Sequence, residues 1–213
     1  LTTEDPEIGC RTPSKDRLEQ SRSRVVLTRP PYRITDAPLG VHLRYSLTND
    51  IILNRIGDDV PRSKTVFLSV HADSLHSSVR GAMAYVPSRY LRPSKPYTLG
   101  RSDIQGFAEY KAHPTIRLGT NFKARVEASS RHMAGSIIAS LERNEIMVHE
   151  NEPVRDRVLR GRRRPWVPAV LRYTAAGNAV LVEVCNIANS EDRELITQHE
   201  WRESFARAVV EGV

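Results

Sequence analysis

Two ionisable residues, His71 and Glu183, belong to apolar stretches that are typical of buried strands. His71 ends the stretch 65–71, and Glu183 interrupts the stretch 179–184. A carboxylate is costly to bury without a partner, so Glu183 indicates either an ion pair or a chemical role. Because open α/β sheets bind ligands at the carboxyl ends of their strands, the two side chains would share a cavity if these strands are central neighbours.

A histidine beside a carboxylate suits a metal-activated water molecule. Imidazole binds zinc, bound zinc lowers the pKa of water to about 7, and a glutamate can take and return the proton. This chemistry predicts a hydrolase that acts on a carbonyl compound. A structural alternative is that His71 caps its strand by hydrogen bonding and Glu183 pairs with one of the many arginines. The pattern alone leaves both interpretations open.

The elements that must position these residues alternate along the chain. Strands are predicted at 25–27, 65–71, 81–86 and 179–184, and helices at 39–56, 124–143 and, as one or two helices, 191–213. This alternation predicts an α/β fold with a central, mostly parallel or mixed sheet flanked by helices, in a single domain spanning residues 1–213. Residues 1–24 are predicted to be an irregular lead-in with a short helix near 16–21. Residues 87–122 show no clean period and are predicted to form an insertion or long excursion.

The composition is that of a globular protein with a basic charge. The chain has 213 residues, 39% of them hydrophobic, and no apolar run reaches the roughly 18 residues of a membrane span, so no transmembrane segment is expected. Cys10 and Cys185 form no disulfide framework and no metal-binding spacing, and are either free thiols or a single bridge. The net charge of +7 favours a polyanionic partner, namely nucleic acid, a membrane surface or an anionic cell wall.

The densest charge lies in an arginine cluster at 155–164. Guanidinium groups there can contact phosphates or carboxylates, or the cluster can be a solvated face. Nucleic-acid-binding proteins commonly interleave aromatic and basic residues or carry a recognisable module, whereas only Trp166 and Tyr173 stand near this cluster. Nucleic acid is therefore not the expected partner, and a basic nucleic-acid-binding domain is the third hypothesis of function.

Four blocks of sequence carry a resemblance in their order as well as their residues. They are VVLTR at 25–29, a helix with Leu39, Arg44 and Asn49, FLSVHADS at 67–74, and AVLVEV at 179–184. They resemble the V-x-L-T-R, L-x-x-x-x-R-x-x-x-A-N, F-I-S-I-H-A-N-S and A-V-L-V-E blocks of the zinc-dependent N-acetylmuramoyl-L-alanine amidase family. The resemblance covers about half the chain. Asp73 replaces the family's asparagine, and Cys185 and Asn186 replace a Gly-Phe pair.

The resemblance implies roles for three residues. His71 matches a family zinc ligand, Glu183 matches the catalytic base, and Glu4, which stands 24 residues before Thr28, lies about where a second ligand is expected. The family's first ligand is a histidine that precedes all of these blocks, whereas no histidine of this sequence precedes His42.

The implied activity is zinc-dependent hydrolysis of the amide between N-acetylmuramic acid and L-alanine in peptidoglycan, at a periplasmic or extracellular location. Zinc would polarise the carbonyl group, and Glu183 would carry the proton to the leaving amine. Because extra segments in this family can be regulatory, 87–122 is expected to shape or gate the groove, and a regulatory protein is a second expected partner. The alternative is a degenerate amidase-like domain that binds wall glycan or a partner protein without turnover.

Overall fold

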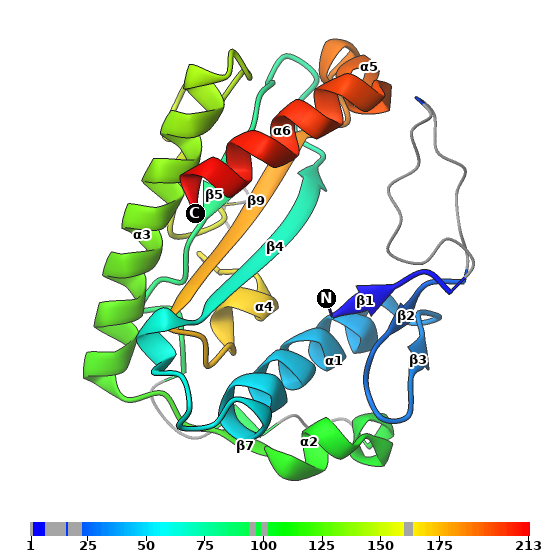
Figure 1. The fold of residues 1–213 in the computed structure, drawn as a ribbon, viewed down its shortest axis with the longest axis vertical. Coiled ribbons are helices and arrows are strands. Elements are labelled where there is room, and N and C mark those ends of the chain that lie inside the picture. Colours follow the sequence, from blue (N-terminus) through cyan, green and yellow to red (C-terminus); the bar gives the residue numbers. More distant parts are fainter. Residues whose placement is uncertain (1, 7–15, 17–22, 94–96, 99–101, 160–163) are drawn as a thin grey trace.

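A mixed sheet of four strands forms the centre of the computed structural model, which describes residues 2–6, 16, 23–93, 97–98, 102–159 and 164–213. The strands are β4 (Val66–Asp73), β9 (Asn178–Asn186), β5 (Met83–Tyr85) and β8 (Val154–Arg155), and they lie in that spatial order. β4 is parallel to β9, β5 is antiparallel to β9, and β8 is parallel to β5. Helices flank this sheet (Figure 1), which confirms the predicted fold class.

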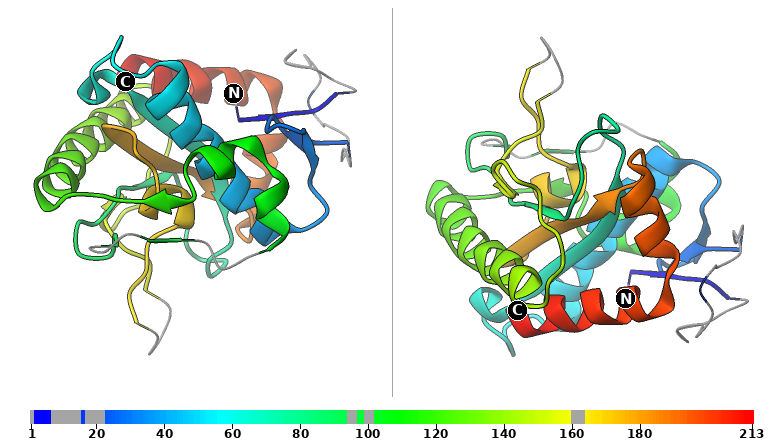
Figure 2. Two further views of the ribbon diagram at one scale, coloured as in Figure 1. Left: turned by 90° about the horizontal axis from the view of Figure 1, so that it is seen from below. Right: turned by 90° about the horizontal axis from the view of Figure 1, so that it is seen from above.

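Two helices, α3 (Thr120–Arg143) and α6 (His199–Gly212), cover one face of the sheet (Figures 1 and 2). The core beneath them joins Ile137 and Leu141 of α3 to Phe205 of α6 and to Val180 and Val182 of β9. The helices cross closely, since a Cβ on Gly212 would stand 2.5 Å from the Cα of Ile137. Of the one or two helices predicted at 191–213, the structure has two, α5 (Ser190–Thr197) and α6.

The other face packs against α4 (Ala169–Arg172) and the end of a long helix. That helix, α1 (Ala37–Asp50), begins where the Asp36 carboxylate accepts the Leu39 N–H at 2.8 Å, and it continues as a π-helical turn, η1 (Ile51–Arg55). Short 3-10 turns, η2 (Arg62–Lys64) and η3 (Asp103–Gly106), occur elsewhere. The structure thus confirms the helix predicted at 39–56.

A separate antiparallel sheet lies across from β4 (Figure 1). Its strands are β1 (Thr3–Glu4), β2 (Val25–Val26) and β3 (Tyr32–Arg33). The strand predicted at 25–27 therefore forms, but it pairs in this small sheet and not in the central one. The predicted short helix at 16–21 lies outside the described residues apart from Asp16.

The segment 87–122 contains more regular structure than its sequence indicates. It includes η3, α2 (Ala108–Ala112) and a two-stranded ribbon of β6 (Tyr97–Thr98) and β7 (Thr115–Ile116). Ile104, Phe107 and Tyr110 pack with residues of α1 in one apolar cluster. The segment is thus built into the body of the protein beneath α1, although its role as an insertion stays a prediction.

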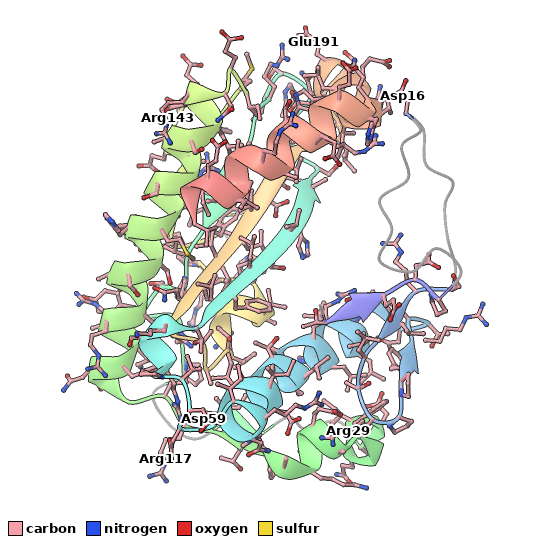
Figure 3. The ribbon with its side chains drawn as sticks, in the orientation of Figure 1. Asp16, Arg29, Asp59, Arg117, Arg143 and Glu191 are labelled. Atoms are coloured by element: carbon pink, nitrogen blue, oxygen red, sulfur yellow. The ribbon has the colours of Figure 1, made fainter. Side chains whose placement is uncertain are left out.

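An ion network with two buried carboxylates and two partly exposed arginines fixes α2 to α1. The side chain of Glu109 on α2 is 0% exposed, and its carboxylate accepts hydrogen bonds from the backbone and Nε of Arg29 and from Arg55. Asp50 at the end of α1, also buried, pairs with both arginines at 3.2 and 2.9 Å. Figure 3 shows Arg29 beside α2. Two buried carboxylates shared by two arginines hold these elements in one arrangement.

None of the helices in the described part of the chain is both long and apolar enough to cross a membrane.

Candidate active site

His71 and Glu183 lie opposite each other on neighbouring parallel strands. Their Cα atoms are register partners in the ladder between β4 and β9. Side chains alternate between the two faces of a strand, and residues in register across a ladder lie on the same face. The sheet therefore sets the two residues that the sequence singles out in register, on the face that also carries Tyr85. They nevertheless line two different cavities among the described residues, contrary to the shared cavity expected from the sequence.

The surroundings of Glu183 disfavour the charged form of its carboxyl group. It stands in a strand whose neighbours Val182 and Val184 are buried, and its Oε2 is buried with no hydrogen-bond partner among the described residues. Burial first, and then the negative charge of Asp73, raise its pKa from 4.5 to about 7. A carboxyl group that titrates near neutral pH can both accept and donate a proton.

Asp73 and Tyr85 border Glu183 from the two adjacent strands. Burial raises the pKa of the Tyr85 hydroxyl, and the charge of Asp73 adds to that rise. Arg155 of β8 offsets part of it through its charge and a hydrogen bond to the Tyr85 side chain. The side chains of Asp73, Glu183, Tyr85 and Arg155 therefore form a polar cluster that extends across the sheet from β4 to β8.

His71 faces a long groove, which we call the β4 groove, with a volume of about 1070 Å³. One wall is residues 66–72 of β4, and the other includes β1 and the α1 residues Arg44 and Thr48. β4 is the edge strand of the sheet, and no described strand pairs with its outer side. Its Val70 side chain is 58% exposed. His71 is exposed at the groove, but partial desolvation by its surroundings, followed by the charge of Arg44, lowers the pKa of its imidazole, which favours the neutral form that binds metals.

Glu4 lies on the same groove, in β1 on the wall across from β4. Its neighbour Thr3 accepts a hydrogen bond from Nε of Arg44 at 3.2 Å, which ties β1 to α1. The groove thus holds both predicted metal ligands, His71 and Glu4. The described residues nevertheless contain no group of three or more His, Cys, Asp or Glu side chains placed to hold one metal ion.

A second cavity, which we call the Glu183 pocket, opens beside the catalytic candidate and has a volume of about 790 Å³. Its lining includes Glu183, Asp73 and Tyr85 together with residues 152–159 and Trp166. Arg155 and Arg157 of the arginine cluster therefore line this pocket, a placement that the sequence did not indicate. Its members Arg160, Arg162 and Arg163 lie outside the described residues.

The loop that follows His71 is fixed by two buried polar residues. The Asn186 amide donates to the carbonyls of His76 and Val79 at 2.9 and 2.6 Å. The Asp192 carboxylate accepts the backbone N–H groups of Gly81 and Asn186 at 2.8 and 2.9 Å. These bonds hold both ends of the loop against the carboxyl end of β9.

Gly81 itself cannot carry a side chain at this position. Its φ is +90°, and an added Cβ would stand 2.6 Å from the backbone carbon of Val148. The turn that leads into β5 therefore depends on a glycine. Beyond the site, Cys185 is a buried free thiol, whereas Cys10 lies outside the described residues.

The sequence of this chain matches the model of the family described as N-acetylmuramoyl-L-alanine amidase over residues 13–213. The chain therefore belongs to the N-acetylmuramoyl-L-alanine amidase family, as its four sequence blocks predicted. No curated protein sequence matches it significantly.

Several solved structures are similar to this chain. The CwlD amidase of Clostridioides difficile, in complex with the GerS lipoprotein, is 16% identical over 84% of this chain and 64% of its own, with a TM-score of 0.49. The amidase Ami1 of Mycobacterium smegmatis is 16% identical over 93% of this chain and 90% of its own, with a TM-score of 0.44. The amidase AmiC2 of Nostoc punctiforme is 18% identical over 79% and 61%, with a TM-score of 0.44. The chain thus spans less than two thirds of the length of CwlD and of AmiC2.

Proposed function

We propose that this protein hydrolyses the amide bond between N-acetylmuramic acid and L-alanine in bacterial peptidoglycan. The observation that carries the proposal is Glu183, a carboxyl group with a pKa of about 7 and an unpartnered oxygen, set beside His71 in a chain of the amidase family. Peptidoglycan lies in the cell envelope, so we also propose a periplasmic or extracellular location. A regulatory protein partner stays a prediction.

Glu183 supplies the proton transfers of this reaction. As a carboxylate it takes a proton from the water that adds to the lactyl carbonyl carbon. As a carboxylic acid it then gives that proton to the nitrogen of L-alanine while the carbon–nitrogen bond breaks. The products are a free lactyl carboxyl group on the sugar and a free amine on the peptide. A pKa of about 7 suits a group that must change its protonation state twice in one turnover.

Zinc dependence is a separate proposal, because the described residues alone do not complete a zinc site. His71 and Glu4 would hold the ion from opposite walls of the β4 groove, and a third ligand would have to come from outside the described residues. A zinc ion bound there would polarise the carbonyl group and activate water. We expect metal analysis after incubation with zinc to find about one ion per wild-type chain and a large loss in His71→Ala. A wild-type protein that binds no zinc would rule out this proposal.

The hydrolytic role is tested by release of stem peptides from purified peptidoglycan. Glu183→Gln keeps the shape of the side chain but removes its proton transfer, so we expect at least a hundredfold loss of rate. Glu142→Gln is the matched control, because Glu142 is exposed on α3 away from the site and its removal should leave the rate unchanged. A Glu183→Gln protein that keeps more than about a tenth of the activity would refute the assignment of Glu183 as the base.

A second candidate function is binding of wall glycan or a partner protein without catalysis. The observation that favours it is the absence of a three-ligand metal group among the described residues. It predicts that the wild-type protein sediments with purified peptidoglycan but releases no peptide, with or without added zinc. Hydrolysis by the wild type would exclude it.

A further inference from the structure

The lining of the Glu183 pocket includes two large apolar side chains in contact with solvent, Leu159 and Trp166. Val158 and Trp166 form an antiparallel bridge, in which the Val158 N–H donates to the Trp166 carbonyl at 2.7 Å. Trp166 is 39% exposed, and Leu159, which follows Val158 in the chain, is 66% exposed. Both line the pocket, and no ring-stacking contact of Trp166 with another described residue is seen. A partly exposed indole in a pocket wall indicates a ligand with an apolar face.

Fixed polar groups lie next to this aromatic surface. The Asp156 carboxylate binds Arg157 through two hydrogen bonds of 2.7 and 3.2 Å, and Arg131 of α3 lies 3.6 Å from it. The pocket is lined by three arginines and four carboxylates, so it offers no excess of positive charge to an anionic ligand. Paired planar groups instead offer neighbouring donors and acceptors in a fixed geometry.

A pyranose ring matches both features. Its axial C–H groups form an apolar patch that packs on the negative face of an aromatic ring, and its hydroxyl and acetamide groups need hydrogen-bond donors and acceptors at the rim. A pocket of about 790 Å³ is within the range that encloses small organic ligands and has room for one or two sugar rings.

We propose that the Glu183 pocket binds the sugar side of the substrate, with an N-acetylated amino sugar stacked on Trp166 and hydrogen-bonded by the Arg157–Asp156 pair. This inference rests on the proposed function and assigns a direction to the substrate. The sugar lies towards Trp166, the scissile amide lies at Glu183, and the peptide extends towards His71 and the β4 groove.

The two tryptophans of the chain give a direct test by fluorescence. Trp201 is stacked on Phe205 in α6, on the opposite face of the sheet, so Trp201→Phe leaves Trp166 as the reporter of the pocket. We expect chitotetraose, a neutral oligomer of N-acetylglucosamine, to change the emission of this variant in a saturable way. Free stem peptide at the same concentration should not change it. A response to the peptide alone would overturn the proposal.

Calorimetric titration with chitotetraose tests the contribution of the ring itself. Trp166→Ala should weaken binding about tenfold, while Trp201→Phe should bind as the wild type does. Equal affinities of Trp166→Ala and wild type would overturn the proposal, even if the protein proves to be an active amidase. Sugar binding that depends on Trp166 would support the proposal even if no peptide is released, in which case only the hydrolytic function fails.

Discussion

Replacing Glu183 by glutamine should stabilise the protein, and the gain should depend on pH. The native structure raises the pKa of this carboxyl group from 4.5 to about 7 because burial and Asp73 disfavour the charged form. The native state therefore holds a proton that the unfolded state releases between these two pH values. The extra free energy of unfolding that comes from this bound proton is present in full in the wild type below pH 4.5, and it is lost as the pH rises to about 7. Glutamine has no charge to bury, so the variant does not lose stability in this way.

The difference between 4.5 and about 7 sets the size of the effect. Each pKa unit corresponds to about 1.4 kcal/mol, so the upper bound is roughly 3 kcal/mol above pH 7. Glu183 keeps some contact with solvent, so we expect about 1–3 kcal/mol. At pH 4.5 the free energies of unfolding of the two proteins should differ by less than about 0.5 kcal/mol, because the native Glu183 is then neutral and only about half of its unfolded form is ionised.

The measurement is urea-induced unfolding followed by far-UV circular dichroism at half-unit steps from pH 4.5 to 8. Other groups titrate alike in both proteins, so the difference between the two free energies isolates Glu183. Glu142→Gln should differ from the wild type by less than about 0.5 kcal/mol at every pH. A Glu183→Gln difference that stays constant across this range would refute the argument that Glu183 is a buried carboxyl with a raised pKa.

Two further predictions concern the elements around the site. Gly81→Ala should destabilise the protein by about 2 kcal/mol or more, since φ is +90° and the new Cβ would collide with Val148, whereas Gly135→Ala in the open middle of α3 should stabilise it by about 0.5–1 kcal/mol. Thermal unfolding of the pair measures both effects, and equal shifts would contradict the steric argument. Glu109→Gln should cost about 1–2 kcal/mol in urea unfolding, because it removes one buried charge while the arginine partners, 61% and 43% exposed, stay screened by solvent. A cost below about 0.5 kcal/mol would show that the network does not depend on that charge.

The pairing of His71 with Glu183 was accessible to sequence reasoning for a physical reason. Strands buried on both faces are continuous apolar runs, and a lone ionisable residue in such a run is conspicuous. This holds for β9, whereas β4 is a largely exposed edge strand, so the prediction of a buried strand at 65–71 was wrong. The apolar pattern still located both residues, but the register that sets them opposite each other came from the structure.

The remaining parts of the site had no comparable signal. β8 is two residues long, too short for a periodic pattern, so the sequence could not place Arg155 beside Tyr85. Trp166 reaches the pocket through a single bridge to Val158, a tertiary contact that no local spacing encodes. The segment 87–122 likewise packs against an apolar surface of α1. Its own helices and strands are too short to give a periodic pattern in the sequence.

The unpaired outer side of β4 should be visible in the exchange rates of its own backbone amides. Thr65 accepts a hydrogen bond from Asn178 of β9 at 3.0 Å, and backbone groups alternate along a strand, so the amides of Phe67 and Ser69 point towards β9. Those of Leu68 and Val70 point towards the groove. Deuterium should therefore replace hydrogen slowly at the first pair and quickly at the second, within one continuous strand. Any segment that pairs along this edge would slow the second pair alone, so these two amides report when the edge is occupied.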